Sequence, residues 1–200
     1  CDVYLYSVYS LDYNEEISIV KDLRERYPKA KHIAGGPHPT IFPDECSGSF
    51  DSIILGDGEE SIVRAINDFR DSKFERIYRQ ESPIDINKYS VPRRKYLPKS
   101  AIAKKGLMSS RHKKEFEELL GTTVVFSRGC PYGCSFCAIP SIRGFNPGIR
   151  ERKPELIEEE IRYLQKDYEI EGINILDEIG IPLSRRKAIS YLEAIGNTGI

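Results

Sequence analysis

The chain has 200 residues, with 30 Lys and Arg against 31 Asp and Glu, and a formal net charge of −1. This balance excludes a general electrostatic attraction to nucleic acid or to an anionic membrane. Hydrophobic residues make up 40% of the sequence and charged residues 30%, as in ordinary globular proteins that bury a core. No apolar run approaches the roughly 18 residues of a membrane span, so we expect one large or two small globular domains.

Strands and helices alternate over residues 1–80. Strand-like runs are separated by an amphipathic helical segment at 14–27 and by a second helical segment that ends near residue 70. The four strand-like runs are 2–9, 31–34, 51–55 and 76–79. This rhythm predicts a parallel, Rossmann-like (flavodoxin-like) α/β domain, whose ligands bind at the carboxyl ends of the strands.

Glycine-rich turns follow two of these strands. The first contains Gly35, Gly36, Pro37 and His38, and the second contains Gly56, Asp57, Gly58 and Glu59. Taken alone, either run is also compatible with an ordinary tight turn. Their common place at strand ends makes them candidate ligand-binding turns.

Residues 81–121 lack clear periodicity and are punctuated by Pro83, Pro92 and Pro98. We interpret them as an interdomain linker. Within the linker, residues 93–114 hold nine Lys and Arg and no acid. Such a run usually forms a solvated surface, and the alternative is a surface that binds phosphate.

A cysteine-rich segment follows a strand-like run at 122–127. Cys130, Cys134 and Cys137 have the spacing C-x3-C-x2-C, with no fourth cysteine nearby. Soft thiolate ligands suit an iron–sulfur cluster. Three protein ligands on a four-iron cube leave one iron open, and an open iron can bind and activate a small molecule. The loop therefore indicates catalysis rather than simple electron carriage.

The elements after the cysteines continue an α/β pattern. Pro154 begins a periodic helical segment, residues 172–176 form a strand-like run that ends at Asp177 and Glu178, and a further helix is expected at 184–195. Residues 122–200 thus predict the start of a TIM-like β/α barrel, with its chemistry at the carboxyl ends of the strands. The chain is expected to be a piece of a longer protein, because it stops where a third barrel strand would begin.

The cysteine loop resembles the signature of the radical S-adenosylmethionine (SAM) enzymes, including the aromatic Phe136 before the third cysteine. The resemblance implies that Cys130, Cys134 and Cys137 ligate a [4Fe–4S] cluster, and that SAM binds the fourth iron and is cleaved to a 5′-deoxyadenosyl radical. It further implies that Phe136, Asp177 and Glu178 lie near SAM.

Residues 1–80 resemble the cobalamin-binding domain that precedes the barrel in one large class of radical SAM enzymes. The resemblance is carried by a serine at one strand end, a glycine pair about 25 residues later and the two glycine-rich turns. The family's D-x-H-x-x-G motif is absent and would lie with a first strand before Cys1, and His38 does not replace its histidine. The resemblance implies a cobalamin site at Ser7, Gly35, Gly36, Pro37, His38, Gly56, Gly58 and Glu59.

The expected protein is a radical SAM enzyme, cobalamin-dependent, that performs methyl transfer or rearrangement at an unactivated carbon. Its expected partners are a small-molecule substrate and an electron donor of the flavodoxin or ferredoxin type, with nucleic acid disfavoured. An oxygen-sensitive cluster implies a reducing compartment, the cytoplasm.

Three alternatives stay open. A methylthiotransferase acting on RNA or protein would need a second three-cysteine site, which Cys1 and Cys46 cannot supply. A zinc site would need a fourth ligand, for which His112 is the nearest candidate. A non-catalytic electron-transfer module could use the same loop.

Overall fold

The computed structural model describes residues 2–80, 82–107, 114–139 and 148–200. It divides into two compact units, one of residues 1–84 with 132–148 and the other of residues 85–131 with 149–200. The predicted domain boundaries at 80 and 121 stay a prediction, although residues 85–121 lie within the second unit rather than outside both. None of the helices among the described residues is long and apolar enough to cross a membrane.

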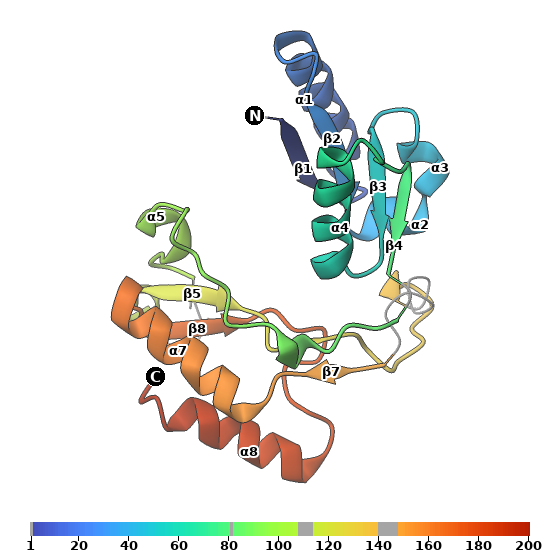
Figure 1. Cartoon of the computed structure of the whole chain (residues 1–200). Coiled ribbons are helices and arrows are strands. Elements are labelled where there is room, and N and C mark those ends of the chain that lie inside the picture. Colours follow the sequence, from blue (N-terminus) through green and yellow to red (C-terminus); the bar gives the residue numbers. More distant parts are fainter. Residues whose placement is uncertain (1, 81, 108–113, 140–147) are drawn as a thin grey trace. The chain divides into compact units, whose positions relative to one another are not determined.

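The first unit is built on a four-stranded, entirely parallel sheet in the order β1-β2-β3-β4 (Figure 1). Its strands are β1 (Val3–Ser7), β2 (Lys31–Gly35), β3 (Ser52–Leu55) and β4 (Ile77–Arg79). The connections run through α1 (Tyr13–Arg26), α2 (Pro37–Ile41), α3 (Pro43–Cys46) and α4 (Glu59–Arg70). The predicted parallel α/β sheet is therefore confirmed.

Helices cover both faces of this sheet, as a doubly wound fold requires. One buried cluster joins Val20 of α1 and Cys46 of α3 to Ala34 and Ile53 of the sheet. A second cluster joins Ala65 of α4 to Ile33 of β2, Ile54 of β3 and Tyr78 of β4. The alternation of side chains along each strand divides its residues between the two clusters.

Asp51 fixes the edge of the sheet at which β3 begins. Its carboxylate accepts hydrogen bonds from Arg24 Nη2 at 2.8 Å, Lys31 Nζ at 3.0 Å and the His32 amide at 3.0 Å. Burial alone would raise the pKa of Asp51, but the Lys31 and His32 hydrogen bonds and the charge of Arg24 outweigh it, and the pKa is lowered. The group is thus held in its charged form.

The second unit pairs β5 (Gly121–Val124) with β8 (Gly172–Ile175) in parallel, and α7 (Pro154–Tyr168) and α8 (Arg185–Gly196) pack side by side against the pair (Figure 1). This is the expected strand–helix–strand–helix opening of a β/α barrel. The smaller elements of the chain are η1 (Ile86–Lys88), α5 (Lys99–Ile102), η2 (Lys114–Glu117), β6 (Ser127–Arg128) and β7 (Arg150–Glu151).

Arg94 anchors the predicted linker segment to the rest of the second unit. Its guanidinium donates to Thr122 Oγ1 and to the Thr123 carbonyl, each at 2.9 Å, and lies 3.4 Å from Glu160 Oε1. Glu160 is only 2% exposed, and burial raises the pKa of its carboxyl, while the positive charge of Arg94 opposes that shift. Part of the basic run therefore serves packing rather than forming a solvated surface. Residues 108–113 of that run lie outside the described residues.

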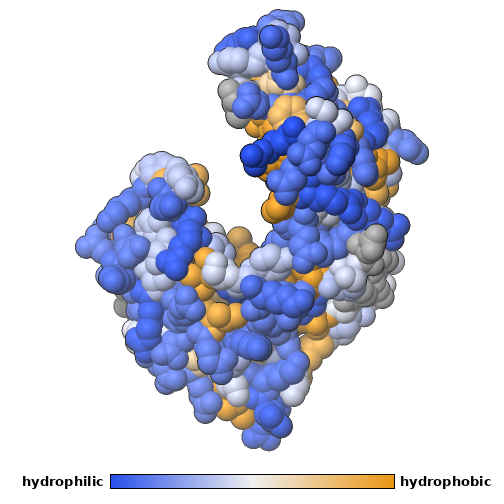
Figure 2. All heavy atoms as spheres, viewed as in Figure 1, coloured by the Kyte–Doolittle hydropathy of each residue, from blue (hydrophilic) through white to orange (hydrophobic). Residues whose placement is uncertain are grey.

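The surface of the units is mostly hydrophilic, with scattered hydrophobic atoms (Figure 2). Isolated exposed apolar side chains such as Leu11 and Tyr96 are ordinary on the surface of a folded domain.

Candidate active site

The segment that carries the cysteines leaves and rejoins the second unit through a short antiparallel pair. Ser127 and Arg128 of β6 pair with Glu151 and Arg150 of β7. Sequence reasoning continued the preceding strand to residue 127, whereas the structure ends β5 at Val124 and begins the new pair at Ser127. Two-residue strands carry too short a pattern to be recognised from sequence. The pair joins the two ends of the 129–149 segment at its base.

Gly129 turns the chain out of β6 into the cysteine loop. Its φ is +88°, in the left-handed region that side chains other than glycine rarely adopt. Cys130 follows directly and is half-buried, Cys137 is also half-buried, and Cys134 is exposed. The Cys137 amide donates to the Cys134 carbonyl at 3.1 Å. The local backbone thus folds into a turn between the second and third cysteines.

The donor set of this loop fits an iron–sulfur cluster. Three cysteines that form no disulfide lie within eight residues, and thiolates are the ligands that such clusters use. Cys130 belongs to the second compact unit, and Cys134 and Cys137 belong to the first. Within the described part of the chain, no three His, Cys, Asp or Glu side chains are gathered in the manner of a closed metal site. The assignment of the three cysteines rests on their chemistry and spacing.

Phe136 is 91% exposed, which is unusual for a phenylalanine. Its ring presents a flat apolar face beside the last cysteine. The described residues thus leave it available to a ligand.

Asp177 ties the end of the second barrel strand to the end of the first. The β5–β8 ladder continues past β8, where the Leu176 amide donates to the Val124 carbonyl at 2.9 Å. One residue later, Asp177 Oδ1 accepts from the Phe126 amide at 2.7 Å. Glu178 is exposed, so the two neighbouring acids differ in role. Asp177 holds the backbone four residues before Cys130, and Glu178 is open to solvent.

The environment of Asp177 favours its neutral form. Burial raises the pKa of its carboxyl, and the negative charge of Glu178 adds to that rise, while the hydrogen bond from the Phe126 amide opposes it. The net direction is upward. Asp177 is thus a perturbed carboxyl at the carboxyl end of a barrel strand, where this architecture places functional groups.

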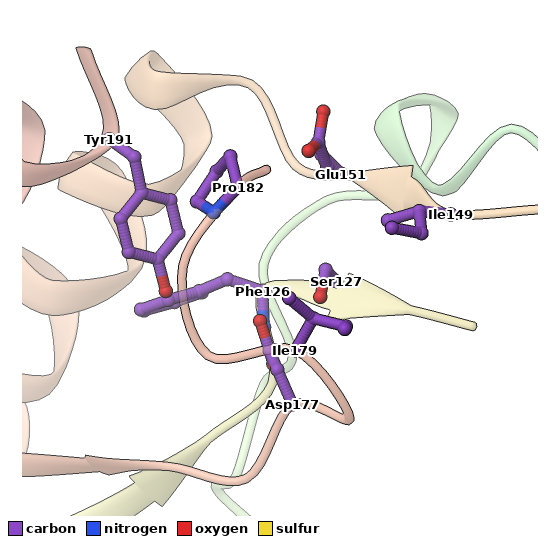
Figure 3. Close-up of a pocket in the computed structure, with 8 residues that line it drawn as sticks. All are labelled: Phe126, Ser127, Ile149, Glu151, Asp177, Ile179, Pro182 and Tyr191. Atoms are coloured by element: carbon purple, nitrogen blue, oxygen red, sulfur yellow. The ribbon is translucent and has the colours of Figure 1, made fainter. Parts of the chain in front are cut away.

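A small pocket beside Asp177 brings together polar atoms from three elements (Figure 3). Ser127 Oγ, Asp177 Oδ2 and Tyr191 Oη are buried and have no hydrogen-bond partner among the described residues. Figure 3 shows the Tyr191 hydroxyl pointing from α8 toward Phe126 and Asp177. Burial raises the pKa of Tyr191, and the charge of Asp177 adds to the effect. The pocket can therefore hold one small hydrogen-bonding group, such as a water molecule.

Sequence reasoning did not find Tyr191 or assign a role to Ser127. The usable signal was weak: Tyr191 and Ala194 occupy the buried face of α8 three residues apart, and a buried tyrosine normally has a polar partner.

In the first unit, the structure brings several of the predicted cobalamin contacts together. Ser7 and Gly35 are direct partners in the β1–β2 ladder, and Gly36 follows at the same edge. Thr40, which sequence reasoning missed, links this edge to the next strand end. Its Oγ1 donates to the Gly36 carbonyl at 2.7 Å and accepts from the Gly56 amide at 3.1 Å. Gly35, Gly36 and Gly56 thus belong to one connected strand-end region.

Gly36 has a structural explanation that does not need a ligand. Its φ is +104°, and a Cβ at this position would lie 3.0 Å from the Val8 carbonyl oxygen and 3.1 Å from the Val8 amide nitrogen. The backbone of Val8, directly after β1, therefore leaves no room for a side chain at position 36, and glycine is required there. Gly35 differs, because its Cβ would meet Ile54 Cβ at an ordinary 3.7 Å.

The remaining predicted contacts lie at the starts of helices. Pro37 begins α2, and His38 is 4% exposed, with Nδ1 hydrogen-bonded to Ser10 Oγ at 2.9 Å and its ring against Tyr13 and Phe42. Gly58 precedes Glu59 at the start of α4, and a Cβ on Gly58 would meet nothing within 4 Å. Local packing thus occupies His38 but does not explain a glycine at position 58.

Comparison with known proteins agrees with this geometry. Residues 124–198 match the Radical SAM superfamily. The chain is similar to the bacteriochlorophyllide d C-12(1)-methyltransferase of Chlorobaculum tepidum, with 27% identity over 67% of this chain and 26% of that protein. It is also similar to TokK, a cobalamin-dependent radical SAM methyltransferase of Streptomyces tokunonensis, with 26% identity over 99% of this chain and 30% of that protein.

A solved structure shares the fold across both units. The cobalamin-dependent SAM radical enzyme OxsB, with aqua-cobalamin bound, matches with a TM-score of 0.64 and 15% identity over 97% of this chain and 28% of that one. This chain spans less than a third of the length of each of these three relatives. The comparisons confirm the predicted resemblance: residues 124–198 match the Radical SAM superfamily, and a cobalamin-dependent radical SAM methyltransferase is among the proteins to which the chain is similar.

Proposed function

We propose, on the basis of the radical SAM domain at residues 124–198, that Cys130, Cys134 and Cys137 bind a [4Fe–4S] cluster with one iron open to SAM. The observation that carries the proposal is a three-thiol loop that follows the first barrel strand, β5, by way of the two-residue strand β6. When bound, the cluster supplies the one electron that cleaves SAM to methionine and a 5′-deoxyadenosyl radical. An external donor of the flavodoxin or ferredoxin type would provide that electron.

The chain's own residues would position these groups. Asp177 fixes the Phe126 amide, and the β6–β7 pair fixes the base of the loop, so the backbone around Cys130 is held from two sides. Phe136 would offer its exposed ring to the adenine, and Glu178 its exposed carboxylate to a polar group of SAM. These contacts are consistent with a strand-end site in a β/α barrel.

The first unit would bind cobalamin at the edge formed by Ser7, Gly35 and the Gly56 turn. Parallel doubly wound sheets bind ligands at this edge, and the similarity to TokK and OxsB supports cobalamin as the ligand. The protein would then use the radical for methyl transfer or rearrangement at an unactivated carbon of a small-molecule substrate.

The methylthiotransferase alternative gains no support from Cys46. This thiol is fully buried, and burial raises its pKa to about 11, so it is not disposed to ligate a second cluster. Cys1 and His112, the other residues considered for additional sites, lie outside the described residues.

The direct test is anaerobic incubation of the cluster-reconstituted intact protein with SAM and dithionite. Formation of 5′-deoxyadenosine, lost in Cys134→Ala and kept in Cys46→Ala, is the expected result. A cluster-replete protein that yields no 5′-deoxyadenosine would refute the proposed reaction. Corrinoid absorbance after incubation with cobalamin tests the second cofactor separately, and its absence would confine the function to cobalamin-independent chemistry.

A further inference from the structure

The β6–β7 pair at the base of the cysteine loop is too short to be stable by itself. Each strand contributes two residues, and Cys130 follows β6 after a single glycine, Gly129. A two-stranded ribbon is only marginally stable in water even when it is longer than this. The pair therefore depends on contacts from neighbouring segments. Asp177 supplies one of them, next to β6, at the Phe126 amide.

The side chain of Asn87 occupies the outer edge of β7. The Arg152 amide donates to the Phe126 carbonyl at 2.8 Å, so this amide faces the partner strand. Because hydrogen-bonding groups alternate in direction along an antiparallel strand, those of Glu151 and Lys153 point to the opposite edge. There, Asn87 Nδ2 donates to the Glu151 carbonyl at 3.1 Å, and the Lys153 amide donates to Asn87 Oδ1 at 2.8 Å. The carboxamide thus pairs with β7 as the backbone of a third strand would.

Arg152 returns two hydrogen bonds to the segment that carries Asn87. Its Nη1 donates to the Ile86 carbonyl at 2.8 Å and to the Tyr89 carbonyl at 3.0 Å. Ile86 is itself buried, which holds this segment against the second unit. Four hydrogen bonds, each between residues 63 to 66 positions apart, therefore join residues 86–89 to residues 151–153.

Asp85 fixes the conformation of Asn87 locally. It precedes η1, and its Oδ1 accepts a hydrogen bond from the Asn87 amide at 3.0 Å. The Lys88 amide donates to the Asp85 carbonyl at 3.0 Å. This is an Asx-turn, in which an aspartate side chain bonds the backbone two residues further on. Because the turn already orders the Asn87 backbone, less conformational entropy is lost when its side chain bonds β7.

We propose that Asn87 is a positioning residue for Cys130: by completing the outer edge of β7, it keeps the β6–β7 pair closed and holds the backbone that presents this thiol. Gly129 turns the chain directly from β6 into Cys130, so opening of the pair displaces Cys130. The proposal rests on the proposed function only where it treats Cys130 as a cluster ligand. The closure of the pair is a property of the chain itself.

The test uses the intact protein and replaces Asn87 rather than Arg152, because the charge of Arg152 also acts on the buried carboxyl of Glu160. Asn87→Ala removes both hydrogen bonds to β7. Asn87→Asp keeps an acceptor for the Lys153 amide and loses the donor to the Glu151 carbonyl. Ile161→Val is the matched control, because it destabilises the same unit by trimming a fully buried side chain of α7.

Hydrogen exchange at the Arg152 amide, in the protein without its cluster, reports whether the pair opens. This amide bonds Phe126 and not Asn87, so a change there shows that the effect has passed through β7. Its exchange should be about tenfold faster or more in Asn87→Ala, intermediate in Asn87→Asp and within about twofold of the wild type in Ile161→Val. Equal acceleration in Asn87→Ala and Ile161→Val, or none in Asn87→Ala, would overturn the proposal.

Alkylation by iodoacetamide in the same cluster-free protein reports how Cys130 is presented. Cys130 is half-buried, whereas Cys134 is exposed and serves as the internal control. In Asn87→Ala, Cys130 should react about threefold faster or more, and Cys134 should change by less than about twofold. An equal change at both thiols, or a change at neither, would contradict the positioning role.

Iron release to a ferrous chelator after anaerobic reconstitution links this role to the cluster. Asn87→Ala should lose iron faster than the wild type and Ile161→Val, and release at the wild-type rate would contradict the proposal. A wild-type protein that holds no cluster would refute the proposed function instead. In that case hydrogen exchange and alkylation still decide whether Asn87 positions Cys130.

Discussion

Gly36 gives the sharpest prediction for the first unit, because two independent features forbid a side chain there. Its φ of +104° lies in a region that is nearly restricted to glycine, and a Cβ would approach backbone atoms of Val8 at 3.0 and 3.1 Å. Backbone strain of this kind costs about 1–3 kcal/mol, and overpacking against backbone that cannot rotate away costs about 1–3 kcal/mol more. We expect Gly36→Ala to lower the free energy of unfolding by roughly 2–6 kcal/mol.

Urea unfolding followed by circular dichroism measures this loss. For a unit of this size, about 1 kcal/mol corresponds to a shift of about 4–8 °C in Tm, so the variant should melt at least about 8 °C lower. Gly48→Ala is the control, because its Cβ would meet nothing within 4 Å and its φ is not in the left-handed region. A Gly36→Ala protein within about 0.5 kcal/mol of Gly48→Ala would refute the steric argument.

The remaining predictions concern buried polar groups. Arg94→Met should cost about 3–5 kcal/mol in urea unfolding, because it leaves Glu160 buried without its partner; a loss under about 1 kcal/mol would contradict this. Asp51 has a lowered pKa, so its stabilisation is present above the unfolded pKa of about 3.9 and is lost as pH falls through the lower folded value. The free energy of unfolding of Asp51→Asn should therefore depend less on pH in the acid range than that of the wild type. Tyr191→Phe should change stability by less than about 1 kcal/mol, because the hydroxyl has no described partner, and a larger loss in thermal unfolding would show that it has one.

The Gly36 result also separates two explanations of the glycine pair. Gly36→Ala is expected to destabilise the fold, so a loss of cobalamin binding in this variant would not show that Gly36 contacts the cofactor. Gly35→Ala is better suited, because its Cβ makes only an ordinary contact with Ile54. A folded Gly35→Ala protein that takes up less cobalamin than the wild type would support a ligand at this edge.

The α/β architecture was predictable because its signals are long and periodic. Apolar runs bounded by glycine or proline marked β2 and β3, and amphipathic periodicity marked α1 and α7. The short helices α2 and α3 were missed, because four or five residues show no helical periodicity and their prolines favoured a turn, although proline fits the first turn of a helix equally well.

The contacts that organise the candidate site were not predictable, because they join residues far apart in sequence. Arg94 was part of a basic run, and nothing local showed that it would be buried beside Glu160. The Asp177 contact with the Phe126 amide depends on how β5 and β8 pair. The cysteines were predictable because their chemistry lies within eight residues.

The most direct test of the central claim is the iron and sulfide content of the anaerobically reconstituted intact protein and of two cysteine variants. The wild type should hold about four iron and four sulfide per chain at the cysteine loop. Cys46→Ala, which removes a fully buried thiol, should keep that content, and Cys134→Ala should lose it. Unchanged iron and sulfide in Cys134→Ala would contradict the assignment of the cluster to this loop.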